Sequence, residues 1–134
     1  MSLAKGSFTD ITLSLLRAVA GFLFLQHGAQ KLFAVLGRAE AVELFSRFGV
    51  AGVLEFFGGL LILFGLFTRP VAFVLSGQMA VAYFLSHFPR GFWPIENGGE
   101  LAALYSFLFL FLFAVGGGSY SVDGLLRGED DTGT

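Results

Sequence analysis

Four long apolar segments constrain this chain more than any other feature. They cover about residues 11–33, 50–67, 71–88 and 100–115. A helix that crosses a bilayer needs roughly 17–25 mainly apolar residues, and each segment meets or approaches that length. Charged residues make up 13% of the 134-residue chain, against about 25% in an ordinary soluble domain. The sequence therefore predicts an all-α integral membrane protein in which residues 1–134 form a single four-helix bundle.

The composition also excludes several classes of function. The net charge is −2 and no basic run is present, so we do not expect nucleic acid as a partner. The chain has no cysteine, which excludes iron–sulfur ligation and zinc–thiolate sites formed by this chain. No group of histidines and carboxylates has the spacing of metal ligands, so no metal site is predicted. The expected partner is the lipid bilayer.

The segment ends give further expectations. Thr9 or Asp10 is predicted to cap the first helix. Apolar residues at helical spacing in the connection 34–49 predict a short interfacial helix. The polar residues 127–134 are predicted to be a disordered tail. Four crossings place both termini and the second connection at one end of the bundle, here called side A, and the first and third connections at side B. Basic residues divide almost evenly between the two sides, so charge does not orient the protein.

Small residues recur every seven positions on the first two helices. These stripes are Ser14, Gly21 and Gly28 on the first helix, and Ala51, Gly58 and Gly65 on the second. Small side chains let helix backbones approach closely, and a seven-residue period keeps one face toward a neighbour. The pattern predicts a left-handed bundle in which the first two helices make the closest contact through these stripes. The alternative is a chance recurrence in a glycine-rich chain.

Arg17 lies inside the first apolar segment. A charged group at the centre of a membrane helix costs about 2.5–3.5 kcal/mol on insertion scales and usually faces the bundle interior. Arg17 shares a helix face with Gly21 and Gly28, so we expect it to point inward. Its expected structural partners are Gln78 or the segment 116–123, where Asp123 is the nearest acid. The alternative is that the side chain extends to the water at side A.

A second polar group is expected near side B. Glu55 shares its helix face with glycines, and His27, Lys31, His87 and Glu100 belong to the same level of the membrane. We predict a pocket that contains Glu55 and Glu100, with a loop carrying Trp93 at the membrane surface or above it. The candidate ligand-binding residues are His27, Lys31, Glu55, Trp93 and Glu100. The alternative readings are a structural hydrogen-bonding role for Glu55 and water-exposed interfacial positions for the histidines.

The ordered set of these motifs resembles the DoxX family of small membrane proteins. The set spans Leu16 to Asp123, and no single piece of it is specific. One departure is Gly117, where the family is expected to favour proline. The matching motifs are Leu16-Arg17, Gln26 to Phe33, Glu55 with Gly58 to Leu61, Gly65 to Arg69, Phe92-Trp93, Glu100 with Leu104-Tyr105, and Gly116 to Asp123.

The resemblance implies a multi-pass protein of the plasma (inner) membrane with cytoplasmic termini. It also implies a link to quinone chemistry, because some members are subunits of quinone-coupled oxidoreductases such as thiosulfate:quinone oxidoreductase. Other members are associated with oxidative-stress enzymes, and most have no established activity. The family therefore implies a fold more firmly than a reaction.

Two functions stay open at this point. The first is a quinone-linked redox component, acting alone, as a homo-oligomer or with oxidoreductase partner subunits. The second is a non-enzymatic membrane module, such as a small transporter, a lipid-binding protein or a scaffold for soluble enzymes. A quinone head group is the leading candidate ligand, whereas haem held by His27 and His87 is not favoured. The sequence assigns no catalytic residue and does not decide whether the protein is an enzyme.

Overall fold

The computed structural model describes residues 4–132, and over these residues the chain is helical without strands. It forms four long helices in this range: α1 (Phe8–Phe33), α2 (Arg47–Phe64), α3 (Thr68–Ala82) and α5 (Glu100–Val115). The shorter elements are the π-helix η1 (Tyr83–His87), the 3-10 helix η2 (Phe88–Arg90), α4 (Pro94–Asn97) and α6 (Val122–Thr132). The predicted all-α membrane fold is confirmed.

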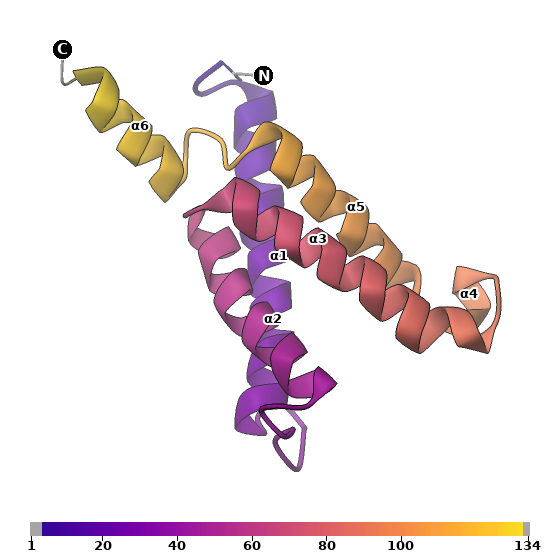
Figure 1. The fold of residues 1–134 in the computed structure, drawn as a ribbon. Helices are drawn as coiled ribbons and strands as arrows, with labels where there is room; N and C mark the ends of the chain where they lie inside the picture. Colours follow the sequence, from indigo (N-terminus) through magenta and orange to yellow (C-terminus); the bar gives the residue numbers. More distant parts are fainter. Residues whose placement is uncertain (1–3, 133–134) are drawn as a thin grey trace.

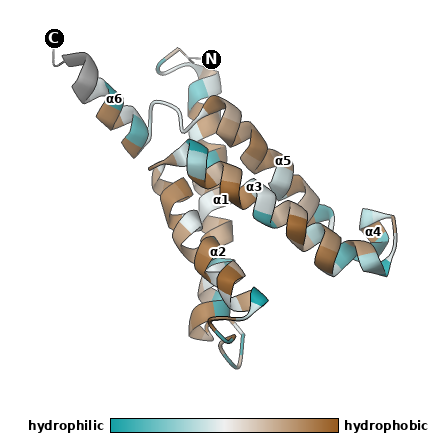
Figure 2. Cartoon of the chain, viewed as in Figure 1, coloured by the Kyte–Doolittle hydropathy of each residue, from teal (hydrophilic) through white to brown (hydrophobic). Residues whose placement is uncertain are grey.

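The long helices differ in how far they could reach across a bilayer. Among the described residues, α1, α2 and the continuous stretch Thr68–Arg90 are long and apolar enough to span a membrane. The apolar helix α5 has 16 residues, which rise about 24 Å against a hydrocarbon core of about 30 Å. Figure 2 shows hydrophobic residues along all four helices, whereas hydrophilic residues gather at α4, α6 and the helix ends. A surrounding bilayer would cover the many exposed phenylalanine and leucine side chains.

The helices are arranged as two antiparallel pairs, α1 with α2 and α3 with α5. Figure 1 shows both pairs diverging from side A, the end at which the two termini lie. Their side-B ends, marked by the connection between α1 and α2 and by α4, are far apart in this view. The pairs meet around buried side chains that include Phe24, Ile62, Leu75, Phe109 and Leu112.

Glycines bring α1 and α2 into backbone contact. A methyl carbon placed on Gly21 would overlap the backbone nitrogen of Leu63, and one on Gly28 would overlap that of Phe56. From the opposite helix, a carbon on Gly59 would lie 2.6 Å from the backbone of α1. The predicted close contact of the first two helices through Gly21 and Gly28 is therefore confirmed.

The prediction that Gly58 on the second helix faces the first helix is wrong. A methyl carbon on Gly58 would lie 2.9 Å from the side chain of Leu75, on α3. Gly65 ends α2 in the left-handed conformation and lies against Ser121 and Arg17. Successive helical residues point about 100° apart, which follows from 3.6 residues per turn. Gly58 and its neighbour Gly59 therefore face different helices.

Three helices begin earlier than predicted, α3 among them at Thr68. The Ser7 hydroxyl accepts a hydrogen bond from the amide of Asp10 at 3.1 Å, so Ser7 caps α1 in place of Thr9 or Asp10. The Ser46 hydroxyl accepts from the amide of Gly49 at 3.1 Å and caps α2. Residues 34–46 form turns, so the prediction of an interfacial helix in this connection is wrong. Its last apolar residue, Phe48, belongs instead to the first turn of α2.

The prediction of a disordered tail is also wrong over residues 127–132, which belong to α6. The Ser121 hydroxyl accepts from the amide of Gly124 at 3.0 Å and provides an N-terminal cap. Residues 133–134 lie outside the described part of the chain. In Figure 1, α6 projects away from the four long helices at side A.

Arg17 joins three parts of the chain at side A. Its side chain is only 4% exposed, which confirms that it points into the protein. Its Nε donates to the carbonyl oxygen of Ile62 at 3.0 Å, and its terminal nitrogens donate to those of Gly117 and Tyr120, the latter at 3.0 Å. The hydrogen-bond partners are therefore carbonyl oxygens, including two from the predicted segment 116–123. Neither Gln78 nor the Asp123 carboxylate bonds to Arg17.

Two carboxylates complete this junction. Asp123 accepts hydrogen bonds from the amides of Phe67 and Thr68, both at 2.9 Å, and so caps the start of α3. Phe67 needs this support because its φ of 52° is unfavourable for a residue with a side chain. Asp10 is fully buried and accepts from the amide of Ser119 at 2.9 Å. The segment between α5 and α6 is therefore fixed against α1, α2 and α3 at side A.

Replacing Gly21 with alanine is expected to lower the free energy of unfolding by roughly 1–3 kcal/mol, because the added methyl group forces the backbones of α1 and α2 apart. The matched control is Gly77→Ala, because a methyl carbon there meets no atom within 4 Å. The control should leave stability unchanged or raise it by up to about 1 kcal/mol. Circular dichroism recorded during unfolding in mixed detergent micelles measures the free energy of unfolding of both variants. Equal effects of the two substitutions would contradict the contact.

Arg17→Gln is expected to lower the free energy of unfolding by roughly 2–5 kcal/mol, since it removes the donors to the carbonyl oxygens of Gly117 and Tyr120 at about 1–3 kcal/mol each. The control is Arg90→Gln, which changes an exposed arginine of η2 at the opposite end. The same unfolding measurement applies. An Arg17 variant as stable as the Arg90 variant would show that the side-A junction does not depend on this guanidinium.

Candidate functional site: a cleft between the helix pairs

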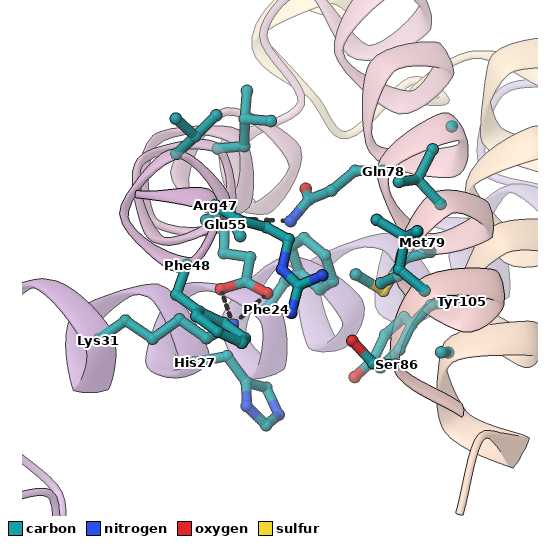
Figure 3. A pocket seen from close by; sticks show the side chains of 18 of the residues that line it. Phe24, His27, Lys31, Arg47, Phe48, Glu55, Gln78, Met79, Ser86 and Tyr105 are labelled. Carbon is teal, nitrogen blue, oxygen red and sulfur yellow. Dashed lines mark hydrogen bonds and ion pairs between the residues drawn. The ribbon is translucent and has the colours of Figure 1, made fainter. Parts of the chain in front are cut away.

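A cleft of about 790 Å³ lies between the two helix pairs. Residues of α1, α2, α3, η1 and α5 line it, and Figure 3 shows many of their side chains turned toward it. Its volume lies within the range of roughly 300–1,000 Å³ that is typical of small-molecule sites. Most of the wall is apolar and includes Phe24, Leu54, Val74, Val81, Leu85 and Leu101.

An ion pair lies on the α1–α2 side of the cleft. The Lys31 ammonium donates to both carboxylate oxygens of Glu55, at 2.6 and 2.7 Å. Lys31 belongs to the last turn of α1, and the close backbone contact at Gly28 brings it beside α2. The Glu55 side chain is 6% exposed and that of Lys31 is 22% exposed. Mutual neutralisation offsets the desolvation of the two charges within the membrane-spanning helices.

Three further polar side chains line the same cleft. His27 is exposed on α1, below the ion pair in Figure 3. The guanidinium carbon of Arg47 lies 4.9 Å from the ring centroid of Phe48, within the range of a cation–π contact. The Gln78 amide nitrogen donates to the carbonyl oxygen of Ala51 at 3.5 Å. Its amide oxygen is buried without a hydrogen-bond partner among the described residues.

The π-helix η1 forms the side-B part of the wall. Ser86 and His87 line the cleft from this segment, which continues α3 with a wider turn. The His87 Nδ1 lies 3.2 Å from the carbonyl oxygen of Asn97. Asn97 is 1% exposed and donates to the carbonyl oxygen of Gly91 at 2.9 Å. A π-turn inside a helix is often found at functional sites, and here it directs side chains toward the cleft.

The sequence profile of the DoxX family matches residues 12–88. The chain belongs to the DoxX family. The matched part contains α1 to α3 and η1, and therefore the ion pair and most of the cleft wall. This DoxX chain is a membrane protein.

Two relatives cover most of the DoxX chain. An uncharacterized protein of Haemophilus influenzae is 44% identical over 118 residues, which are 83% of this chain and 87% of the relative. The inner membrane protein YqjF of Escherichia coli is 32% identical over 127 residues, which are 88% of this chain and 94% of the relative. No solved structure matches the chain significantly.

The structure brings His27, Lys31 and Glu55 to one cleft, but not the other two predicted members of the site. Glu100 is exposed and does not line the cleft. Trp93 is 62% exposed and does not line it either. The predicted pocket with two carboxylates beneath Trp93 is therefore wrong. The helix pairs diverge toward side B, so α4 and the start of α5 lie away from α2 (Figure 1).

Sequence reasoning missed the positions of Arg47 and Gln78 in this cleft. The apolar pattern places Arg47 in a connection, and only the cap at Ser46 shows that it is the first residue of α2. The sequence predicts Gln78 at side A beside Arg17, but it lies on the α3 face that turns toward α2 and the cleft. In the described part of the chain, no three His, Asp or Glu side chains gather as a metal site requires.

Lys31→Met is expected to lower the free energy of unfolding by roughly 3 kcal/mol, because it leaves the Glu55 carboxylate buried without its counter-charge. The double variant Lys31→Met with Glu55→Gln should recover much of that loss, since no uncompensated charge stays buried. Unfolding of the single and double variants in mixed micelles gives the coupling free energy. A double variant whose loss equals the sum of the two single losses would contradict the pairing.

Proposed function

We propose that this protein is a membrane-embedded binding module that holds a small lipid-soluble molecule in the cleft between its helix pairs. The observation that carries the proposal is an ion pair, Lys31 with Glu55, on the wall of a largely apolar cleft. An apolar wall with a few polar groups is the usual composition of a small-molecule site. The apolar part would hold the body of the ligand, and the ion pair would receive its polar head group.

The ion pair has hydrogen-bonding capacity left for a ligand. A lysine ammonium has three donor hydrogens, and Glu55 accepts two hydrogen bonds from Lys31. The remaining donor, together with His27 on the same helix, could meet an oxygen of a bound head group.

Among uncharged ligands, a quinone head group is the leading candidate, because its carbonyl oxygens are hydrogen-bond acceptors on a lipid-soluble molecule. A quinone-linked redox role would require a partner subunit or a bound cofactor to supply electrons. A binding role without redox chemistry, as a lipid-binding module or a scaffold, uses the same cleft. If the termini are cytoplasmic, as the resemblance implies, side B and the polar part of the cleft lie toward the opposite face of the membrane.

Gly77→Phe is expected to remove the bound molecule by filling the cleft. Gly77 lines the cleft, and a carbon added there meets no atom within 4 Å, so the ring should enter empty space without disturbing the helices. The control is Gly128→Phe, which adds the same ring to a similarly open position on α6. Mass spectrometry of solvent extracts from the purified proteins measures retained quinones and other lipids.

We expect the wild-type protein and the Gly128 variant to retain the same lipid-soluble molecule, and the Gly77 variant to retain at least about tenfold less of it. This corresponds to about 1.4 kcal/mol or more. Equal retention in all three proteins would contradict binding in the cleft. Retention of a molecule other than a quinone, lost in the Gly77 variant, would support the binding module and refute the quinone as its ligand.

A further inference from the structure

The charges that line the cleft do not balance. Its titratable residues are His27, Lys31, Arg47, Glu55, His87 and Tyr105. Glu55 is the single carboxylate among these lining residues, and Lys31 donates to both of its oxygens. Arg47 has no ion-pair partner among the residues whose side chains the structure describes. Among Lys31, Arg47 and Glu55, the cleft therefore carries one positive charge in excess.

The position of Arg47 directs this charge into the cleft. Arg47 is the first residue of α2 and lies at the side-B end, as does Lys31 in the last turn of α1. Figure 3 shows its guanidinium beside the ion pair, in the space between the α1–α2 side and α3. Contact with the Phe48 ring at 4.9 Å restricts its orientation. The N–H donors of its planar guanidinium stay available for a ligand.

The apolar wall extends from this polar end toward the middle of the membrane. Phe24 lies seven residues before Lys31 on α1, which is about 10 Å deeper at the helical rise. Val74 lines the same cleft from α3, and Gln78 on α3 and Ser86 on η1 follow toward side B. A molecule in the cleft would therefore meet positive charge at the membrane surface and apolar side chains below it.

We propose that the ligand is an anionic amphiphile, with a carboxylate or phosphate head group on an apolar tail, and that the Arg47 guanidinium binds this head group. The proposal rests on the binding function proposed above and names the class of its ligand. Arginine binds carboxylates and phosphates through two parallel hydrogen bonds, which are stronger than those between neutral groups. A neutral quinone could use the same cleft but would gain no such charge-assisted contact.

An arginine near a membrane surface could instead extend to the surrounding lipid head groups without selecting a ligand. That alternative treats Arg47 like Arg90, another exposed side-B arginine, which does not line the cleft. Arg90 therefore provides the matched control. The two explanations differ in whether removal of one particular arginine abolishes the preference for anionic ligands.

In the experiment, lipid probes are titrated into the intact purified protein in detergent, and native mass spectrometry measures how much of each probe binds. Two pairs of probes differ mainly in head-group charge: dioleoyl phosphatidic acid with dioleoylglycerol, and oleate with oleyl alcohol. The phosphate pair and the carboxylate pair distinguish the two sources of negative charge. The proteins are the wild type, Arg47→Gln, Arg47→Lys and Arg90→Gln, each checked for helicity by circular dichroism. Gly77→Phe reports whether a probe binds in the cleft.

We expect at least one anionic probe to bind the wild type and the Arg90 variant about tenfold more tightly than its neutral counterpart. Arg47→Gln should abolish that preference while the neutral probe still binds, and Arg47→Lys should keep part of it because the charge is retained. If Arg47→Gln does not fold, the test becomes the comparison of the wild type with Arg47→Lys, whose preference for the anionic probe should be weaker.

Three results would overturn the proposal. Equal affinity of the wild type for charged and neutral probes, with binding lost in Gly77→Phe, would refute the anionic ligand and leave the binding module standing. A preference that persists unchanged in both Arg47 variants would refute the role of this arginine. If the Gly77 variant binds all probes like the wild type, the cleft is not the site, and the proposed function fails as well.

Discussion

The buried guanidinium of Arg17 is the interaction on which the rest of the structure depends. It donates to carbonyl oxygens at the end of α2 and in the segment that follows α5, while its own backbone belongs to α1. In a bilayer, a charge of this kind needs partners within the protein. The carbonyl oxygen of Ile62 belongs to the last turn of α2, where the helix dipole places partial negative charge. By bonding to it and to the segment after α5, Arg17 joins the two helix pairs at side A.

Fixing the pairs at one end leaves the other end free to diverge, and this explains where the cleft lies. Asp10 and Asp123 reinforce the same end by accepting backbone hydrogen bonds. The glycine contact between α1 and α2 then determines which polar groups face the cleft, because backbone contact at Gly28 places Lys31 beside Glu55. The candidate site therefore follows from close packing within one pair and from separation between the pairs.

The sequence predicted the features that depend on local pattern. The apolar runs identified the four long helices, and the bounds predicted for α5 agree with the structure. The cost of a charge in the membrane indicated that Arg17 turns inward, which burial confirms. The common membrane level of Lys31 and Glu55, with Glu55 on a glycine-bearing face of its helix, suggested their proximity. These inferences needed only hydropathy, helical periodicity and electrostatics.

The features that depend on contacts between distant segments could not be predicted in this way. Asp123 caps a helix that begins 55 residues earlier in the chain, so no local capping pattern reveals it. Equal depth in the membrane does not imply proximity when the helix pairs diverge, which is why Glu100 does not join Glu55. The π-turn at η1 likewise has no signal in the apolar pattern.

If the diverging helix pairs enclose a cleft occupied by a lipid-soluble molecule, an experimental structure of the protein in nanodiscs made from native lipids should reveal it. We expect pairs joined at side A, with density for a bound molecule in the cleft within hydrogen-bonding distance of the Lys31–Glu55 pair. A closed bundle in which side chains fill the space between α2 and α3 and leave no room for a ligand would contradict it.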